Sequence, residues 1–142
     1  MLYFEISGYR SRAICQDVVE WFVVTYLPRY HLDIHVLHRG LKREGVMGLC
    51  TVEDCDYRPR AFLIELHSRL DKDTYVKTLL HELWHVYQHV KGYLRDKRSK
   101  RLWKGVDHSD TEYDNQPWEL EAQSMEKTLQ NDYEKQISLC SA

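Results

Sequence analysis

The chain has 142 residues, of which 43% are hydrophobic and 12% aromatic, and its formal net charge is −2. This length and apolar content suffice for a hydrophobic core, and no Ser-, Gly- or Pro-rich stretch divides the chain, so we expect residues 1–142 to form a single domain. The charge argues against a globally basic nucleic-acid-binding protein. No apolar run is long enough to span a bilayer and no secretory leader is evident, so we expect a soluble, monomeric, cytoplasmic protein.

The four cysteines, Cys15, Cys50, Cys55 and Cys140, are scattered along the chain. Four residues separate Cys50 from Cys55, instead of the two that are usual in zinc knuckles. We therefore expect reduced thiols, as in most cytosolic proteins. The alternative is a Cys50–Cys55 disulfide or a second metal site, which nothing else in the sequence supports.

The first half of the chain predicts one helix and three strands. Residues 11–27 carry apolar side chains at helical spacing and stop before Pro28, which indicates an amphipathic packing helix. The segments 31–37 and 46–52 are rich in β-formers and predict neighbouring strands. A third strand, 61–67, is our candidate for a sheet edge to which an extended peptide could add; the alternative is a half-buried structural strand.

The most informative pattern, His81-Glu82-x-x-His85, follows inside an apolar stripe that predicts a helix. Asp73 is its expected N-cap, with Asp71 nearby, and Gly92 is its expected terminator. Positions four apart on a helix lie one turn above each other, so both imidazoles can reach a single ion. Glu82 would sit beside that ion without binding it.

A catalytic zinc ion normally has three protein ligands, so two histidines leave the predicted site one ligand short. A second helix, predicted from Pro117 to about Ile137, offers Glu119 and Glu121, which point about 200° apart and cannot both face the ion. We favour Glu119, because the small Ala122 on the same face would allow a close approach of the two helices. Glu121, or a role for both acids as first-turn residues only, stays open.

The remaining histidines and aromatic residues have weaker claims on the site. His89 lies about 12 Å along the helix from His81 and is expected at the surface or behind the ligands. His108 could be a ligand or substrate contact, and Tyr113 either an oxyanion donor or a packing residue. Packing or solvent-facing positions are expected for the others: His31, His35, His38, His67, Trp84 and Trp118.

A basic stretch, Lys91–Lys104, lies between the two helices and includes only one acidic residue, Asp96. Aromatic residues are interspersed with its cations, so it could make weak contact with nucleic acid or with an acidic protein. The alternative is a solvated hairpin or loop beside the site.

The chain resembles small SprT-like and phage-encoded zincin metallopeptidases of gluzincin type over roughly residues 62–126. The resemblance is carried by His81-Glu82-Leu83-Trp84-His85, Gln88, Trp103, Gly105, Tyr113 and Pro117-Trp118-Glu119-Leu120-Glu121-Ala122. It implies an α+β, minimal zincin-like fold: an N-terminal helix, a small, mainly antiparallel sheet, the motif helix and a C-terminal helix carrying the third ligand. It also implies Zn²⁺, Glu119 as ligand, hydrolysis of proteins, and the host cytoplasm as the setting if the chain is phage-encoded.

The chain departs from the DNA-repair proteases of the SprT group, which use a third histidine and carry additional nucleic-acid modules. A role in DNA-crosslink repair is therefore not expected.

Three functional hypotheses follow from these residues. The first is a zinc metallopeptidase, an endopeptidase, in which His81, His85 and Glu119 hold the ion and Glu82 is the general base that acts on protein or peptide substrates. The second is a zinc-containing nucleic-acid- or protein-binding module with little or no turnover. In the third, the histidines are structural and no metal binds.

Overall fold

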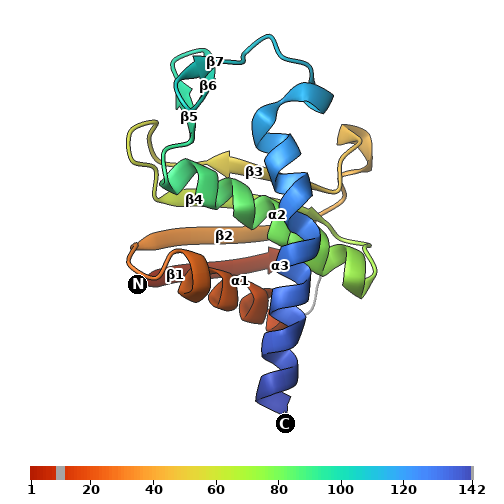
Figure 1. Cartoon of the computed structure of the whole chain (residues 1–142). Coiled ribbons are helices and arrows are strands. Elements are labelled where there is room, and N and C mark those ends of the chain that lie inside the picture. Colours follow the sequence, from red (N-terminus) through yellow and green to blue (C-terminus); the bar gives the residue numbers. More distant parts are fainter. Residues whose placement is uncertain (9–11, 142) are drawn as a thin grey trace.

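A four-stranded sheet, a small hairpin sheet and three long helices make up the part of the chain that the computed structural model describes, residues 1–8 and 12–141 (Figure 1). The chain is therefore α+β, as expected. The elements run in this order: β1 (Leu2–Gly8), α1 (Arg12–Tyr26), β2 (Leu32–Arg39), η1 (Lys42–Glu44), β3 (Gly48–Val52), β4 (Ala61–His67), α2 (Lys72–Val90), β5 (Leu94–Lys97), β6 (Lys100–Trp103), β7 (Val106–Asp107), η2 (Tyr113–Asn115) and α3 (Pro117–Ser141).

The larger sheet is mixed and has the strand order β1-β2-β4-β3. The strands β1, β2 and β4 are parallel, and only β3 pairs antiparallel, with β4. The expectation of a mainly antiparallel sheet is wrong for this sheet. The strand β1 was not predicted from the sequence, and its crossover to β2 through α1 makes these two strands parallel.

The position of β4 inside the sheet corrects two further expectations. The predicted strand 61–67 matches β4, but β4 lies between β2 and β3 and is not an edge. For the same reason β2 and β3 are not neighbours, although they follow each other in the sequence. The edge strand on this side of the sheet is β3.

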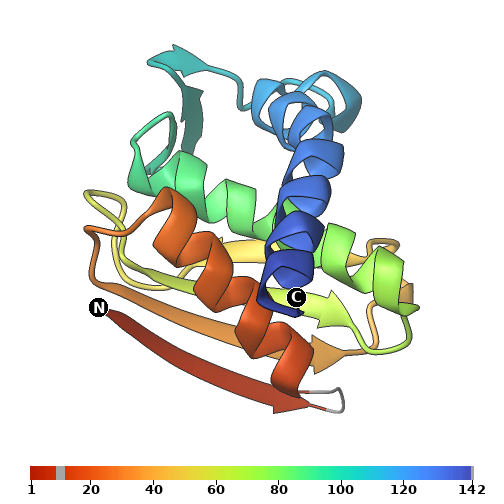
Figure 2. The ribbon, with the colours of Figure 1, turned by 60° about the horizontal axis from the view of Figure 1, so that its bottom comes forward.

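The helices lie in layers over one face of the larger sheet. Figure 2 shows α1 and α2 side by side on that face, with α3 lying across them. Inward-facing residues of β2 and β4 alternate with outward ones and pack under α1 and α2 in one apolar cluster, where each fully buried Leu or Phe contributes about 1.5–3 kcal/mol. The inward residues are Leu32, Ile34, Val36, Phe62, Ile64 and Leu66.

The helix α2 has a cap at each end. Its N-cap is Asp71, whose side chain accepts a hydrogen bond from the Thr74 amide at 2.8 Å, so the expectation that Asp73 caps the helix is wrong. At the other end Gly92 has a φ of +79°, a left-handed conformation that ends helices at little cost for glycine. The motif residues therefore lie in the middle of a continuous helix.

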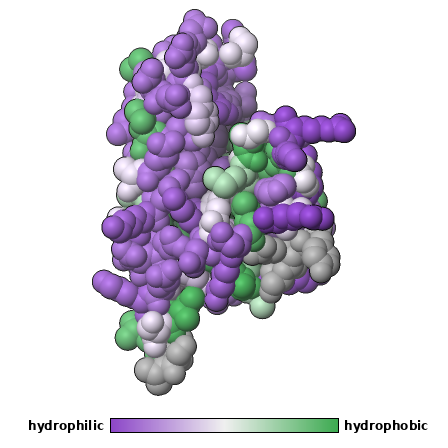
Figure 3. Space-filling view, turned by 90° about the vertical axis from the view of Figure 1, so that its right-hand side faces the viewer, coloured by the Kyte–Doolittle hydropathy of each residue, from purple (hydrophilic) through white to green (hydrophobic). Residues whose placement is uncertain are grey.

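The helix α3 packs through residues at helical spacing, Trp118, Ala122, Leu129 and Tyr133, all of which are buried. The Tyr133 hydroxyl also donates a hydrogen bond to Asp17 of α1 at 2.6 Å. Figure 3 shows mostly hydrophilic side chains on the side of the molecule along which α3 runs, with hydrophobic ones in smaller separate areas. No helix in the described residues is long and apolar enough to cross a membrane.

Cys15, Cys50 and Cys55 are free thiols, so the alternative of a Cys50–Cys55 disulfide is wrong; the side chain of Cys140 lies outside the described residues.

Candidate metal centre

Three side chains from two helices converge in the centre of the molecule. His81 and His85 lie one turn apart on α2, with ring centroids separated by 4.9 Å, and Glu119 lies in the first turn of α3. One ligand atom from each of the three lies within 4.8 Å of the other two. The Nε2 atoms of His81 and His85 are 3.1 and 3.0 Å from the two Glu119 carboxylate oxygens. The structure thus brings together the three residues that the sequence predicted as ligands.

The other candidate acid, Glu121, points elsewhere. Its Oε1 atom accepts a hydrogen bond from the Trp84 indole at 2.8 Å and another from the Gln88 amide at 3.2 Å. Between the two acids that the sequence left open, the structure places Glu119 at the histidines.

The chemistry of this group fits a divalent cation. The His85 Nε2 atom is buried and has no hydrogen-bond partner, although a Glu119 oxygen is near, because the geometry of that contact is not that of a hydrogen bond. Two imidazole nitrogens and a carboxylate are a usual donor set for catalytic zinc. His81, His85 and Glu119 would hold the ion, and the unpaired nitrogen is explained if it is a ligand.

The second ring nitrogen of each histidine, Nδ1, also has a polar partner. His81 Nδ1 is 2.8 Å from Glu126 Oε1, and His85 Nδ1 is 2.7 Å from Gln88 Oε1. Such contacts fix ring orientation and leave Nε2 for the ion. The roles of Glu126 and Gln88 were not predicted from the sequence. Spacing along the helices could have predicted them. Gln88 is three residues after His85 and Glu126 is seven residues after Glu119, so each lies on the helix face that carries the neighbouring ligand.

The carboxylates control the electrostatics of the group. Burial lowers the pKa of His81, but contacts with Glu119 and Glu126 and the charge of Glu82 outweigh burial and raise this pKa to about 9. Burial raises the pKa of Glu119, but the two imidazoles outweigh it and hold this pKa well below its usual value. Burial also raises the pKa of Glu82, against the opposing charges of His85 and His81.

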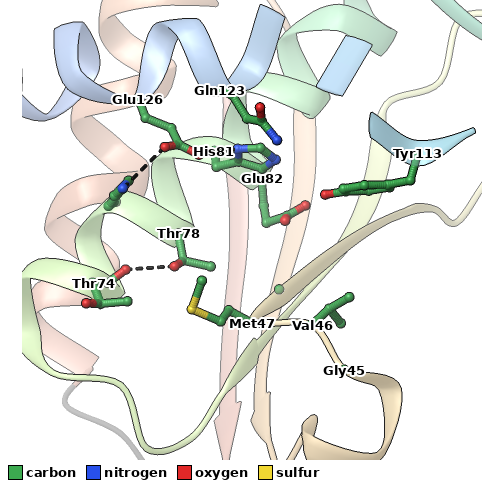
Figure 4. Close-up of a pocket in the computed structure, with 12 residues that line it drawn as sticks. Gly45, Val46, Met47, Thr74, Thr78, His81, Glu82, Tyr113, Gln123 and Glu126 are labelled. Atoms are coloured by element: carbon green, nitrogen blue, oxygen red, sulfur yellow. Dashed lines mark hydrogen bonds and ion pairs between the residues drawn. The ribbon is translucent and has the colours of Figure 1, made fainter. Parts of the chain in front are cut away.

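Glu82 lines a cavity of about 490 Å³ between α2, α3 and the start of β3. Figure 4 shows its carboxylate pointing toward the Tyr113 hydroxyl, with His81 above it and Met47 below it. The Tyr113 hydroxyl donates a hydrogen bond to Glu119 Oε2 at 3.1 Å. Burial, the charge of Glu119 and that hydrogen bond raise the pKa of Tyr113 to about 12, so the phenol stays protonated at neutral pH.

A second cavity of about 220 Å³ lies on the other side of the same carboxylate. It shares Val46, Gly48, Glu82 and Tyr113 with the first cavity and is also lined by Cys50 and His89. Together the two cavities follow the edge strand β3 past the candidate metal centre.

His89 is buried, with 3% of its surface exposed, so the expectation of a surface position is wrong. The helix α2 is covered by the sheet on one side and by α3 and the hairpin on the other, so it has little solvent-facing surface near this residue. Burial lowers the pKa of His89 to about 4 and keeps the ring neutral. Its position behind His85, in the wall of the second cavity, agrees with the alternative expectation.

The remaining predicted residues lie outside the group. His108 Nδ1 is 3.1 Å from the Thr111 hydroxyl, and His108 is not among the residues that could share the ion. His38 is buried, between the Ser7 carbonyl and the Tyr75 hydroxyl. Trp84 and Trp118 are buried packing residues, as expected.

The basic stretch Lys91–Lys104 forms the hairpin β5–β6 and its flanks, which lie beyond the end of α2 (Figure 1). Arg101 is bound by Asp96 through two hydrogen bonds of 2.7 and 3.1 Å. Lys91 lies over the rings of Tyr30 and Tyr87, and Lys104 lies over the rings of Tyr93 and Trp103. The remaining cations of the hairpin are exposed: Arg95, Lys97, Arg98 and Lys100.

In comparisons with known proteins, no family model, no curated protein and no solved structure matches this chain.

Proposed function

We propose that the protein is a zinc-dependent metallopeptidase that cleaves peptide bonds in protein substrates, an endopeptidase. The observation that carries the proposal is the convergence of His81, His85 and Glu119 beside a buried carboxylate, Glu82, in the wall of an open cavity. The resemblance of the motif and of the segment 117–122 to small SprT-like zincins supports the same function. We also propose that the protein is cytoplasmic and monomeric and that its thiols stay reduced.

The catalytic work is divided between the ion and the side chains around it. Zinc held by the three ligands would supply a Lewis acid that polarises a peptide carbonyl and acidifies water. Glu82 takes the proton from the attacking water and passes it to the leaving amine. Its burial suits this task, because a raised pKa makes a carboxylate a better proton carrier near neutral pH.

Tyr113 is placed to assist the same step. Its hydroxyl lies in the cavity next to Glu82 and Glu119, and its high pKa keeps the proton available for donation. By turning its single O–H proton from Glu119 to the substrate, this phenol can donate a hydrogen bond to the oxyanion that develops on the substrate carbonyl.

The edge strand β3 supplies a place for an extended substrate. On the side where β4 lies, the Met47 carbonyl accepts a hydrogen bond from the His67 amide, and the Glu53 amide donates one to the Ala61 carbonyl. Because hydrogen-bonding direction alternates along a strand, the backbone groups of Gly48 and Cys50 point to the free edge. A peptide that pairs with these two residues lies along both cavities and passes Glu82.

The test combines metal analysis with peptidase assays on unfolded protein substrates. We expect one zinc ion per chain, and we expect Glu82→Gln to keep that ion while lowering turnover about 10²–10⁴-fold, the usual contribution of a general base. The exposed Glu134 of α3 provides the matched control, Glu134→Gln, which should keep full activity.

Two outcomes would contradict the proposal. A purified protein that binds no zinc would mean that the histidines are structural. Zinc binding without cleavage of any protein substrate would favour the binding module instead, for which the exposed cations of the β5–β6 hairpin are the observation in support.

A further inference from the structure

Gln88 is a buried amide with no exposed surface, located between α2 and the first turn of α3. It makes three polar contacts. Its Oε1 atom is 2.7 Å from His85 Nδ1, and its Nε2 atom donates hydrogen bonds to the Trp118 carbonyl at 3.0 Å and to Glu121 Oε1 at 3.2 Å. One contact connects Gln88 to the ligand His85, and the other two connect it to Trp118 and Glu121, which lie on either side of Glu119 within two residues.

The surroundings of Gln88 permit only one orientation of its amide. The backbone carbonyl of Trp118 can only accept a hydrogen bond, and the Glu121 oxygen beside it already accepts one from Trp84. Both positions therefore require the NH₂ group, which leaves the amide oxygen toward His85. An oxygen at that position requires a proton on His85 Nδ1.

This chain of contacts decides which nitrogen of His85 is free. With the proton held on Nδ1, the lone pair of a neutral ring is on Nε2, which is the buried atom without a hydrogen-bond partner beside Glu119. The same amide also holds the Trp118 carbonyl, in the residue directly before Glu119.

We infer that Gln88 is a positioning residue, which with Glu121 and Trp84 fixes His85 in the tautomer that binds the metal and holds the turn that carries Glu119. The inference rests on the proposed metal site. Glu121 acts through Gln88, by orienting its amide, and does not touch the ion. Gln88 thus connects ligands on two different helices.

The first experiment measures the tautomer in the wild-type chain loaded with zinc. Nitrogen–proton NMR should show His85 with a proton on Nδ1, shielded from exchange and close to the Gln88 side chain. A proton on Nε2, or one that exchanges with water as fast as on an exposed ring, would overturn the inference. This measurement needs no variant and is decisive even if substitutions at position 88 prevent folding.

The second experiment compares zinc affinities by competition with a chelator. Gln88→Met keeps the size of the side chain but removes the acceptor and the donors, and we expect a 10- to 100-fold loss of affinity, the usual effect of removing a group that orients a ligand. The protected proton on His85 Nδ1 should be lost in the same variant.

Two substitutions at position 121 should differ in their effect on zinc affinity. Glu121→Gln keeps an oxygen that can accept from both Trp84 and Gln88, so the affinity should stay within about threefold of wild type, whereas Glu121→Leu should weaken zinc binding as Gln88→Met does. Gln130→Met is the matched control, because Gln130 bridges α3 to Asp73 of α2, away from the ligands, and its loss should leave the affinity unchanged.

These outcomes separate the inference from the proposed function. If wild type binds zinc and Gln88→Met binds it equally well with the same His85 tautomer, the inference is wrong and the metal site stands. If wild type binds no zinc, the metal site itself fails. If zinc binds as described and no substrate is cleaved, the proposed function fails while the positioning role of Gln88 is retained.

Discussion

Glu82 occupies a space that a glycine keeps open. A Cβ atom added at Gly48 would lie 3.1 Å from the Glu82 side chain and 2.9 Å from Thr78 Cγ2, closer than side chains normally pack. The first residue of β3 therefore sets how near the edge strand lies to the carboxylate that we propose as general base. Position 48 needs a glycine because a larger side chain would collide with Glu82 and Thr78.

We expect Gly48→Ala to lower turnover by about 10- to 100-fold, because small displacements of a catalytic group have effects of that order. Zinc content should not change, since the atoms nearest to the added Cβ belong to Thr78 and Glu82 and not to a ligand. Gly40→Ala is the control, because a Cβ at Gly40 meets no atom within 4 Å. Steady-state peptidase kinetics and metal analysis of both variants check this, and equal rates for Gly48→Ala and wild type would contradict it.

The raised pKa of His81 predicts how metal binding depends on pH. Burial lowers this pKa, but the neighbouring carboxylates raise it to about 9, so a proton occupies the metal-free ring at neutral pH and zinc must displace it. The apparent zinc affinity should rise about tenfold per pH unit between about pH 7 and pH 9 and level off above that range. Titrations corrected for the protonation of the competing chelator measure this; a constant affinity over the range would show that His81 is not a ligand.

The sequence predicted that His81, His85 and Glu119 lie together, because spacing along each of the two helices decides which side chains share a face. Helical geometry alone puts His81 and His85 on one face with Glu82 beside them. The choice between Glu119 and Glu121 rested on the small Ala122, which is fully buried in the structure. What could not be predicted is that Glu121 holds Gln88 and Trp84, because this contact depends on how two distant helices cross.

At the scale of elements, the helices were predicted more closely than the sheet. Helical periodicity is local, so it identified α1, α2 and α3 with bounds close to those observed. Strand order is set by contacts between distant segments, and an alternating pattern does not distinguish an edge strand from an inner one. The prediction that β4 is the edge strand is therefore wrong, although the predicted range of β4 is correct.

The edge strand β3 leads to a prediction about substrate backbones. An extended peptide presents the amides of every second residue to its neighbour, so only one alternating set would bond to Gly48 and Cys50. The test uses a peptide substrate and two N-methylated derivatives of it, which carry the methyl groups on complementary alternating residues away from the scissile bond. One derivative should lose at least tenfold in kcat/KM, and the other should be cleaved nearly as well as the parent peptide. Equal effects of the two derivatives would contradict pairing with β3.

At the scale of the whole molecule, the candidate centre joins α2 to α3 by contacts between polar and charged groups. His81 and His85 are buried at this contact and the Glu119 side chain is only 13% exposed, and two carboxylates, Glu119 and Glu126, face the His81 ring. A cation bound here would neutralise charge in the interior and hold the two helices together. Metal binding should therefore stabilise the entire fold.

We expect zinc at about 100 times its dissociation constant to stabilise the native state by about 2.7 kcal/mol, the amount set by mass action, and a chelator to reverse the effect. Thermal unfolding of wild type with and without zinc measures it. His81→Ala should lose most of the zinc-dependent shift, while the control Gln130→Met should keep it. A melting temperature that does not respond to zinc would contradict a site spanning α2 and α3.

The segment 91–116, which separates α2 from α3 and includes the basic hairpin, lies outside the group of ligands. A cut in this connection would leave two fragments, one with both imidazoles and one with the third ligand. The bound ion would then be a bridge between separate polypeptides, so the fragments would stay associated with zinc and come apart more readily when it is withdrawn. The supply of the ion would in this way govern the assembly of the molecule as well as its chemistry.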